Sequence, residues 1–570
     1  MKNDGSLFAP ERRSLPILVA IVTFMLVALT AAACGRSGAD RSEGGVAAIS
    51  AAAGSETQAA EAEAAALAAA EAAKAEAEAA EAEAAAPEAS GLERADAERL
   101  AAVAVPAPVV SGPAEGVYAA AVTVSATVPL PEARLVYTLD GSAPSARNGT
   151  PYTKPLEIAK SATLRLAAYV PGGNTSRILS MEYTIGEVCV APGGKGDGRR
   201  GAPLGSVAEA VAKARSLGIG IVKLAAGTSF TESVSLDAPI TLSGGWAKGF
   251  AARTGGYAVV TGLESDSSSK KAPAYAIRVA GKAADAGVRI ERVEFRGGAG
   301  SYSTGILVDA GATPAFSDCK ASGGDGSYGY GAAVFGGAEP RFDSCTLSGG
   351  AGATSYGLSV DSAKARVAAS FLLAGSGSVG GYGLSATDAV VRVAGSVLAG
   401  SPANVSYGAA FYTCADSGLE GCTVVGGSGK DSAGVFISAS DPSIVNCIIG
   451  SYGCAKSYGI LDNYGSSAPS RLESVAFTGC SGGIYYDADS KRAYTAVDGS
   501  GVPVSADGKA MQKPRASRIA IADIPLSPGD SYATPSDAPL PPATTLSGDA
   551  AKDIRGKPRT EPWTVGAYEL

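Results

Sequence analysis

The sequence predicts a mainly β protein whose largest part is a right-handed parallel β-helix. Beyond residue 290, a glycine that begins a short apolar strand recurs at successive spacings of 24 to 26 residues. A second column of small residues keeps the same phase, and apolar positions alternate within each unit. Such regularity is typical of one structural unit stacked on copies of itself. About 26 residues can hold three short strands and their bends, with neighbouring coils roughly 4.8 Å apart.

The two columns give the repeat its phase. The glycine column is Gly305, Gly331, Gly357, Gly383, Gly408, Gly434, Gly459 and Gly483. The small-residue column is Val293, Cys319, Cys345, Ser370, Ser396, Cys422, Cys447 and Val475. We interpret the cysteines as a ladder inside the coil, where a bulky side chain would push the rungs apart. A disulfide between adjacent rungs stays geometrically possible. The L-x-x-L-x-L consensus of leucine-rich repeats is absent.

Residues 1–34 have the order of regions of a secretory signal. Three cations lie within the first 13 residues, and an uncharged run from Leu15 to Ala33 ends at Cys34. Residues 30–34 (Thr-Ala-Ala-Ala-Cys) resemble a bacterial lipobox, although Ala31 replaces the usual leucine. The resemblance implies a lipid on Cys34 that anchors the chain to a membrane. The alternative is an uncleaved signal anchor. Both predict an exported chain at the outer membrane, at the cell surface or in the periplasm of a bacterium.

Residues 35–105 are predicted to form a spacer. From 59 to 86 every residue is Ala or Glu except Leu67 and Lys74. Ala and Glu favour a helix, but a single large apolar residue provides no seam for a coiled coil. A semi-rigid solvated helix or a partly disordered stalk is therefore expected.

Residues 106–184 are predicted to form a small β-sandwich of short alternating strands. Asp140 and Gly141 suit a tight turn between two of them. The segment 137–142 (Tyr-Thr-Leu-Asp-Gly-Ser), with Pro144, Tyr152 and Tyr183, resembles the immunoglobulin-like domain at the C-terminus of chitobiases and β-hexosaminidases. The resemblance implies an accessory module without catalytic residues, in proteins that act in a glycan context.

Residues 185–520 are expected to form the β-helix with an N-terminal cap. The segments 193–198 (Gly-Gly-Lys-Gly-Asp-Gly) and 240–246 (Ile-Thr-Leu-Ser-Gly-Gly-Trp) resemble the entry of pectate-lyase-like β-helix proteins. A helix from about Ser206 to Ser216 would cover the first coil and block its open edge. Residues 521–570 resemble the closing segment of such proteins, on Gly-Lys-Pro-Arg at 556–559 and Val-Gly-Ala-Tyr-Glu at 565–569.

Composition excludes several classes of chemistry and of partner. The chain has no histidine, which excludes Ser-His-Asp and Cys-His catalysis and the common His-based zinc sites. A net charge of −8 gives no basic footprint for nucleic acid. No cofactor is predicted apart from calcium, which an acidic glycan site could use.

A tyrosine column precedes the glycines, at Tyr330, Tyr356, Tyr382 and Tyr407. Strict alternation gives Tyr356 the same side as Leu358 and Val360, which predicts an internal aromatic stack. If the bend at the glycine breaks the alternation, the column becomes a platform for sugar rings. These four tyrosines are therefore the candidate binding residues.

The candidate catalytic residues lie in one loop, at Asp487, Asp489, Lys491 and Arg492. Two carboxylates and two cations beside tyrosines are the ingredients of a site for an acidic glycan or calcium, but also of an ordinary solvated loop. Asp309, Asp361 and Asp388 occur at most once per coil and are explained as turn residues.

Fold does not decide function here. The thin spread of charge favours a non-catalytic lipoprotein that presents a β-helix for carbohydrate or surface binding. A polysaccharide lyase or glycoside hydrolase acting on an acidic glycan is the alternative, and a structural role in the cell envelope is a third.

Overall fold

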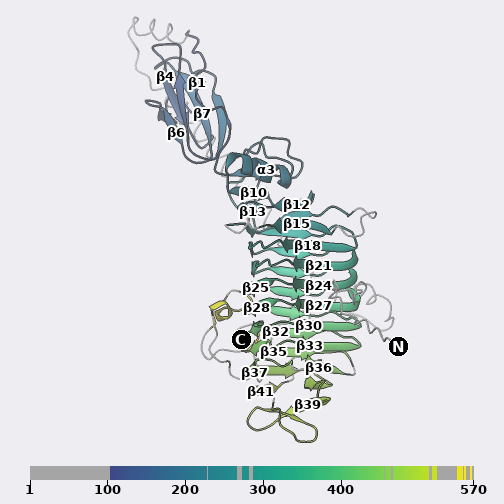
Figure 1. Cartoon of the computed structure of the whole chain (residues 1–570). Helices are drawn as coiled ribbons and strands as arrows, with labels where there is room; N and C mark the ends of the chain where they lie inside the picture. Colours follow the sequence, from purple (N-terminus) through teal and green to yellow (C-terminus); the bar gives the residue numbers. More distant parts are fainter. Residues whose placement is uncertain are drawn as a thin grey trace, which may run out of the picture.

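The computed structural model describes residues 103–227, 229–265, 273–281, 287–454, 456–463, 467–512, 516–522, 543, 548–555, 557–559 and 565–567. They form a small β-sandwich at one end of a long parallel β-helix (Figure 1). The predicted leader with Cys34, and the stalk up to residue 102, lie outside this range. No helix within it is long and apolar enough to cross a membrane.

The β-sandwich packs two sheets around one small core. The smaller sheet has the order β1-β3-β6, with bounds Val109–Ser111, Val122–Thr127 and Leu156–Ile158. The larger has the order β2-β8-β7-β4-β5, with bounds Gly116–Tyr118, Leu179–Ile185, Ala162–Tyr169, Arg134–Thr138 and Thr150–Pro151. Tyr183 and Leu164 are fully buried between the sheets. Asp140 makes the expected turn, where its carboxylate accepts from the Ser142 amide at 2.9 Å.

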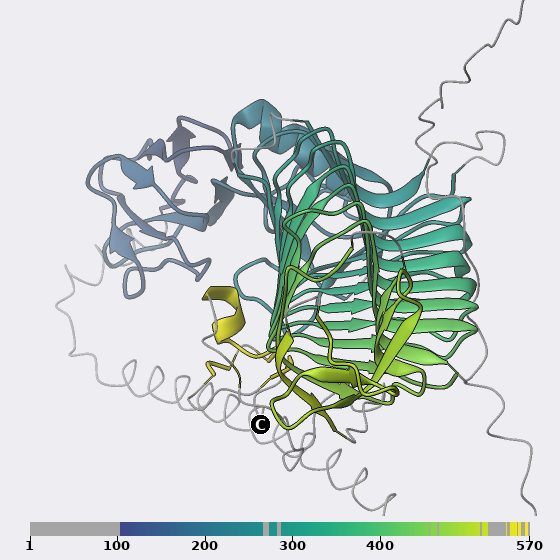
Figure 2. The same ribbon diagram turned by 60° about the horizontal axis from the view of Figure 1, so that its bottom comes forward.

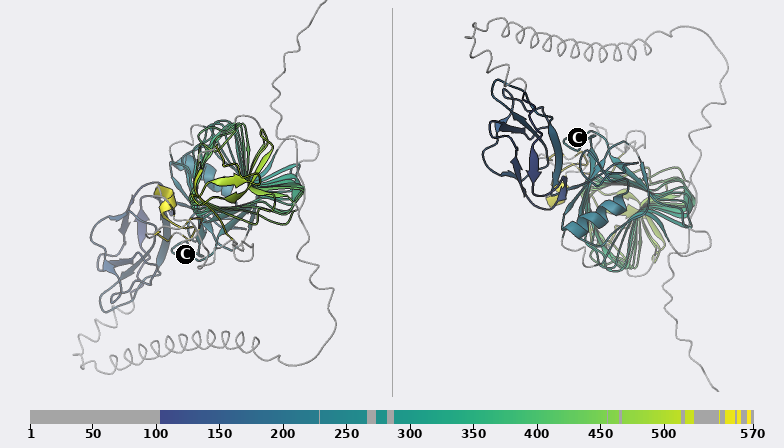
Figure 3. Two further views of the ribbon diagram at one scale, coloured as in Figure 1. Left: turned by 90° about the horizontal axis from the view of Figure 1, so that it is seen from below. Right: turned by 90° about the horizontal axis from the view of Figure 1, so that it is seen from above.

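The β-helix has three faces, each a parallel sheet formed by one strand per coil. The first sheet contains β9 (Val188–Val190), β10 (Ile221–Ala225), β13 (Thr241–Trp246), β16 (Arg289–Glu291), β19 (Ala315–Ser317), β22 (Arg341–Asp343), β25 (Lys364–Ala368), β28 (Val390–Ala394), β31 (Gly418–Glu420), β34 (Ser443–Val445) and the first half of β37 (Arg471–Thr478). Viewed along the axis, successive coils superimpose (Figure 3).

The other two faces complete each coil. The second sheet contains β11 (Ser229–Thr231), β14 (Ala258–Thr261), β17 (Val293–Arg296), β20 (Lys320–Ser322), β23 (Thr346–Ser348), β26 (Phe371–Leu373), β29 (Val397–Ala399), β32 (Thr423–Gly426), β35 (Ile448–Ser451), the second half of β37 and β41 (Ala516–Ile521). The third contains β12 (Val234–Leu236), β15 (Ala274–Ala280), β18 (Tyr302–Asp309), β21 (Gly326–Val334), β24 (Gly352–Asp361), β27 (Gly377–Thr387), β30 (Val405–Tyr412), β33 (Asp431–Ser438), β36 (Ser457–Asp462) and β38 (Gly483–Asp487).

The cysteine and serine column follows the bend between the first and second sheets. A residue in the left-handed region, such as Ser344 at φ 54°, turns the chain there. The next side chain then donates to the carbonyl two residues before it, as Cys345 does to Asp343 at 3.3 Å and Ser370 to Ala368 at 2.7 Å. Ser370 also accepts from the Cys345 amide at 2.9 Å. Cys319 and Cys345 are 1% exposed, which supports the predicted core ladder.

The glycine column marks a sharp bend inside the long strands of the third sheet. At Gly357, an added Cβ would lie 2.6 Å from the Gly383 carbonyl oxygen and 2.6 Å from the Leu373 amide nitrogen. Backbone atoms of two neighbouring segments therefore occupy the space that a side chain would need, and only glycine fits.

Each end of the β-helix is covered. Helix α3 (Val207–Leu217) confirms the predicted cap, and the Ser206 hydroxyl caps it by accepting from the Glu209 amide. The opposite end is covered by β39 (Arg492–Val497) and β40 (Pro503–Ser505), which extend the third sheet in antiparallel fashion. The described part of the C-terminal segment, including the short helix η3 (Gly548–Ala551), lies along the flank of the coils (Figure 2). Its contacts with Val397 and Thr423 place it there rather than at the end.

Candidate functional site

The four candidate catalytic residues lie together at the hairpin between β38 and β39. Asp487 accepts hydrogen bonds from the Asp489 amide at 2.9 Å and from the Ser490 hydroxyl at 2.6 Å. Lys491 holds the turn at φ 54°, and Arg492 is paired across the ladder with Asp487. The Asp487 carboxylate therefore caps its own turn, which is the ordinary use of Asp in a hairpin. A catalytic role for these residues stays a prediction.

A buried carboxylate lies beside this hairpin. Asp462, 6% exposed, is the register partner of Asp487 on the neighbouring strand and accepts from the Tyr485 hydroxyl at 2.8 Å. Burial raises the pKa of Asp462 to about 6. The negative charges of Asp487 and Asp489 act in the same direction, whereas the hydrogen bond from Tyr485 acts to lower the pKa. Asp462 is thus partly protonated close to neutral pH.

We predict that Asp462→Asn stabilises the C-terminal coils at pH 8 and has little effect at pH 4. The pKa of Asp462 is higher in the folded chain than its unfolded value of 3.8. The protonated carboxyl therefore contributes its full stabilisation of the fold below pH 3.8, and this contribution is lost as the pH rises through about 6. The loss corresponds to at most about 3 kcal/mol. Unfolding midpoints of both proteins at the two pH values test this. An equal shift at pH 4 and pH 8 would contradict it. Asp498→Asn, which weakens an exposed turn cap that does not act on Asp462, is the control and should not stabilise at pH 8.

The tyrosine column forms a stack, but strict alternation placed it wrongly. Leu358 and Val360 belong to the central core, whereas Tyr356 belongs to a second cluster on the opposite face of the sheet. The bend at Gly357 reverses the alternation, which explains the difference. The predicted binding residues Tyr330, Tyr356, Tyr382 and Tyr407 line this outer cluster in register.

The tyrosines cover one another. The ring centroids of Tyr330 and Tyr356 are 4.9 Å apart and those of Tyr356 and Tyr382 are 5.1 Å apart, with nearly parallel planes. Tyr356 is 1% exposed, and burial raises the pKa of Tyr382 to about 12. Ring faces that pack on each other are not free to stack on a sugar. Sugar binding by this column stays a prediction.

An arginine column follows the coil axis on the outer side of the first sheet. Arg341, Arg366 and Arg392 are register partners on β22, β25 and β28. Neighbouring strands bring their Cα atoms to roughly 4.8 Å. Arg366 is exposed while Ala365 and Val367 on either side are buried in the core. The sequence already carried this signal, because residues 341, 366 and 392 keep the spacing of the repeat.

The column is interrupted by small residues, and a groove of about 620 Å³ opens there. Gly418 on β31 and Ser443 on β34 occupy the next register positions, and Arg471 on β37 resumes the column. Arg366 and Arg392 therefore border one end of the groove, and Arg471 borders the other end.

Acidic partners are missing from part of this groove. In three coils of this column an acid stands two residues after the arginine: Glu291 follows Arg289, Asp343 follows Arg341 and Glu473 follows Arg471. After Arg366 and Arg392, alanines stand in that position. Arg392 makes no ion pair or side-chain hydrogen bond within the described residues, and the Arg366 guanidinium reaches Glu339 only at 3.7 Å. These two guanidinium groups are the least neutralised charges of the groove.

Two carboxylates complete the lining. Glu420 lies on β31, two residues after Gly418, and Asp549 comes from η3. Asp549 accepts from Arg341 at 2.9 Å, so the C-terminal segment forms one wall of the groove. The site thus combines coils of the β-helix with Asp549, which lies 78 positions beyond Arg471, the last coil residue of the lining.

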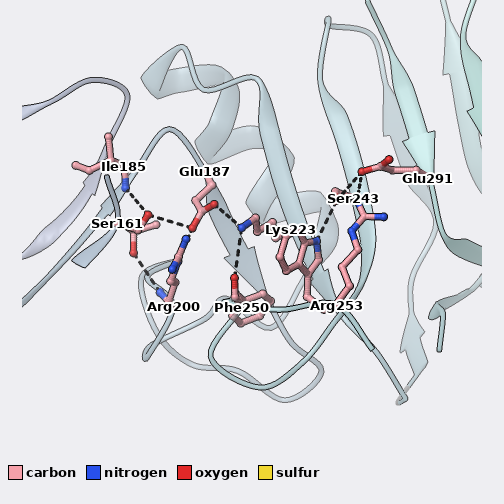
Figure 4. Close-up of polar contacts among 11 residues, drawn as sticks. Ser161, Ile185, Glu187, Arg200, Lys223, Ser243, Phe250, Arg253 and Glu291 are labelled. Atoms are coloured by element: carbon pink, nitrogen blue, oxygen red, sulfur yellow. Dashed lines mark hydrogen bonds and ion pairs between the residues drawn. The ribbon is translucent and has the colours of Figure 1, made fainter. Parts of the chain in front are cut away.

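A separate polar cluster joins the β-sandwich to the β-helix (Figure 4). Glu187, 7% exposed, accepts from Arg200 at 2.6 Å and from Lys223 at 2.7 Å. Burial opposes ionisation of Glu187, but these hydrogen bonds outweigh it and lower the pKa of its carboxyl. The Lys223 ammonium also lies 3.7 Å from the centroid of the Trp246 ring. All of these groups have partners within the protein, so we read the cluster as a structural junction.

Within the described ranges, no group of three or more His, Cys, Asp or Glu side chains is arranged to hold a metal ion. The calcium expected for an acidic glycan site stays a prediction.

One known domain family matches part of the chain. Residues 113–180 match the chitobiase/beta-hexosaminidase C-terminal domain family, which confirms the resemblance seen around Asp140. No curated protein sequence matches the chain. Among solved structures, tailspike protein 3 of bacteriophage CBA120 is 13% identical, with a TM-score of 0.24 over 56% of this chain and 68% of that chain.

The catalytic unit of a thermostable GH87 alpha-1,3-glucanase from Streptomyces thermodiastaticus strain HF3-3 is 11% identical, with a TM-score of 0.22 over 73% of this chain and 87% of that chain. Neither likeness is strong enough to carry an argument about function.

Proposed function

We propose that this protein is a non-catalytic binding protein for acidic polysaccharides, exported and tethered to a membrane by a lipid on Cys34. The observation that carries the binding function is the groove of about 620 Å³ bordered by Arg366 and Arg392. Guanidinium groups form bidentate hydrogen bonds with carboxylate and sulfate-like groups, and they lose less hydration energy on binding than ammonium groups.

The repeat of the fold suits a polymer. Arg341, Arg366 and Arg392 follow one another from coil to coil, so they present cations at regular intervals along the axis. A polysaccharide that carries an acidic group on each unit can contact several coils at once. Many weak contacts of this kind add up through effective concentration. The stacked coils of the β-helix hold the arginine side chains at fixed intervals along one line.

Two features support binding without turnover. The carboxylate of Asp487, a predicted catalytic candidate, accepts hydrogen bonds from its own turn. In the groove, Asp549 is paired with Arg341. A lyase or hydrolase is the second candidate function, because Glu420 and Arg392 line the same groove and supply an acid and a cation. A structural role in the cell envelope is the third candidate function, and it predicts that no polysaccharide binds in the groove.

The test measures binding and turnover of polysaccharides by the purified full chain. We expect retention on alginate and dextran sulfate, with no retention on neutral dextran, and no release of reducing ends or unsaturated products with or without calcium. Steady product release from either acidic polymer would establish the enzyme instead. Absence of binding to every polymer would remove the proposed function and favour the structural role.

A further inference from the structure

The C-terminal segment docks on the flank of the β-helix through specific contacts. We call residues 548–555, 557–559 and 565–567 the strap. The Gly566 amide donates to the Asn446 carbonyl at 2.8 Å, and the Ala567 amide donates to the Thr423 hydroxyl at 3.0 Å. Val565 is fully buried against the second sheet, in a cluster with Val425 and Ile448. The strap is therefore held by backbone pairing and by apolar packing across several coils.

Arg559 ties the strap together from within. Its side chain is 7% exposed, and its guanidinium donates to the Gly566 carbonyl at 2.5 Å and to the Gly421 carbonyl of the coil at 3.4 Å. Its backbone amide donates to the Ala551 carbonyl at 2.9 Å, at the end of η3. One residue thus joins the short helix, the last described residues of the strap and the bend of a central coil.

The helix that Arg559 fixes is the wall of the groove. Ala550 in η3 is fully buried, with its Cβ next to Gly421, and Asp549 beside it lines the groove and contacts Arg341 at 2.9 Å. Gly395 leaves room for this segment, since a Cβ there would lie 2.9 Å from the Lys552 carbonyl oxygen. The groove is therefore incomplete without the strap, although the arginines that border it belong to the coils.

We infer that Arg559 is a positioning residue for the binding site, and that the strap sets which acidic polysaccharides enter it. This inference rests on the proposed function. With the strap docked, one side of the groove is closed by η3 at the level of Arg341. A linear acidic chain fits along the open direction, while a side branch that points toward η3 collides with it. The site then selects unbranched acidic polymers.

The experiment measures the affinity of the full chain for linear alginate and for alginate carrying single-sugar side branches. Arg559→Gln removes the guanidinium hydrogen bonds to Gly421 of the coil and to Lys552 and Gly566 of the strap. Thr423→Val loosens the same strap from the coil side and keeps the test valid if Arg559→Gln does not fold. Lys557→Gln, an exposed strap residue, is the matched control. Hydrogen exchange of the amides of 548–567 reports whether the strap is docked.

We expect both loosening variants to speed exchange in the strap, to bind linear alginate at least as tightly as the wild type because Asp549 no longer neutralises Arg341, and to bring the branched polymer within about threefold of the linear one. The control should behave as wild type in all three respects. A strap that exchanges fast while both affinities stay unchanged would overturn the inference and leave the proposed function standing. Failure of the wild type to bind any acidic polymer would remove the proposed function itself.

Discussion

Replacing Arg366 and Arg392 together by glutamine is expected to weaken alginate binding about a hundredfold. A hydrogen bond to a charged group contributes about 1.5 to 3 kcal/mol, and about 2.7 kcal/mol corresponds to that factor. These two arginines carry the effect because alanines stand where other coils hold an acid, and Arg392 has no ionic partner among the described residues. Titration calorimetry at low and at moderate salt measures the loss, and the salt dependence of binding should flatten in the variant.

Arg289→Gln is the matched control for this pair. Arg289 lies in the same column on the same sheet, three register positions before Arg366, and it is exposed outside the groove. Its replacement removes one charge without touching the site, so affinity should fall less than threefold. Equal losses for Arg289→Gln and for either groove arginine would mean that binding follows overall charge rather than the groove.

The second large effect is expected in the core, at Phe342. Its ring is fully buried and stacks on Phe316 of the preceding coil, with ring centroids 5.0 Å apart. Phe342→Ala removes this contact and leaves a cavity that the stacked coils close only partly, since each rung is held at a fixed distance by its neighbours. The expected cost is about 3 to 5 kcal/mol.

Urea unfolding followed by hydrogen exchange checks this result. Because each coil contacts mainly its neighbours, the amides of coils next to β22 should lose protection before those of the β-sandwich. Ser327→Ala, on an exposed position of β21, is the control and should change stability by less than about 0.5 kcal/mol. A loss spread evenly over both domains would contradict the picture of locally stacked coils.

The architecture was predictable because the repeat constrains the backbone directly. A glycine every 24 to 26 residues and an in-phase column of small residues require stacked coils. The structure supplies the physical cause in both columns. At Gly357, neighbouring backbone leaves no room for a Cβ, and at Ser370 the hydroxyl satisfies backbone groups of its own and the adjacent coil. The turn at Asp140 was predictable for the same reason, since it depends on a local motif.

The candidate site was less predictable. Alternation failed at Tyr356, because a strand that bends at a glycine exchanges its two faces and periodicity alone does not show the bend. The arginine column was present in the sequence as residues with the spacing of the repeat, but its meaning depends on what stands beside it. A column of cations with acids two residues later is neutral, whereas the same column beside alanines attracts anions.

The sequence by itself therefore determined the coil, its phase and the residues inside it, because in-register stacking makes each position a neighbour of its own repeat. Tertiary structure alone decided where the surface is hollow. Gly418 and Ser443 leave space only because larger side chains border them, and Asp549 reaches this space from a segment that Arg559 fixes to the flank. Contacts between segments so far apart in the chain follow no period, so only the folded chain shows them.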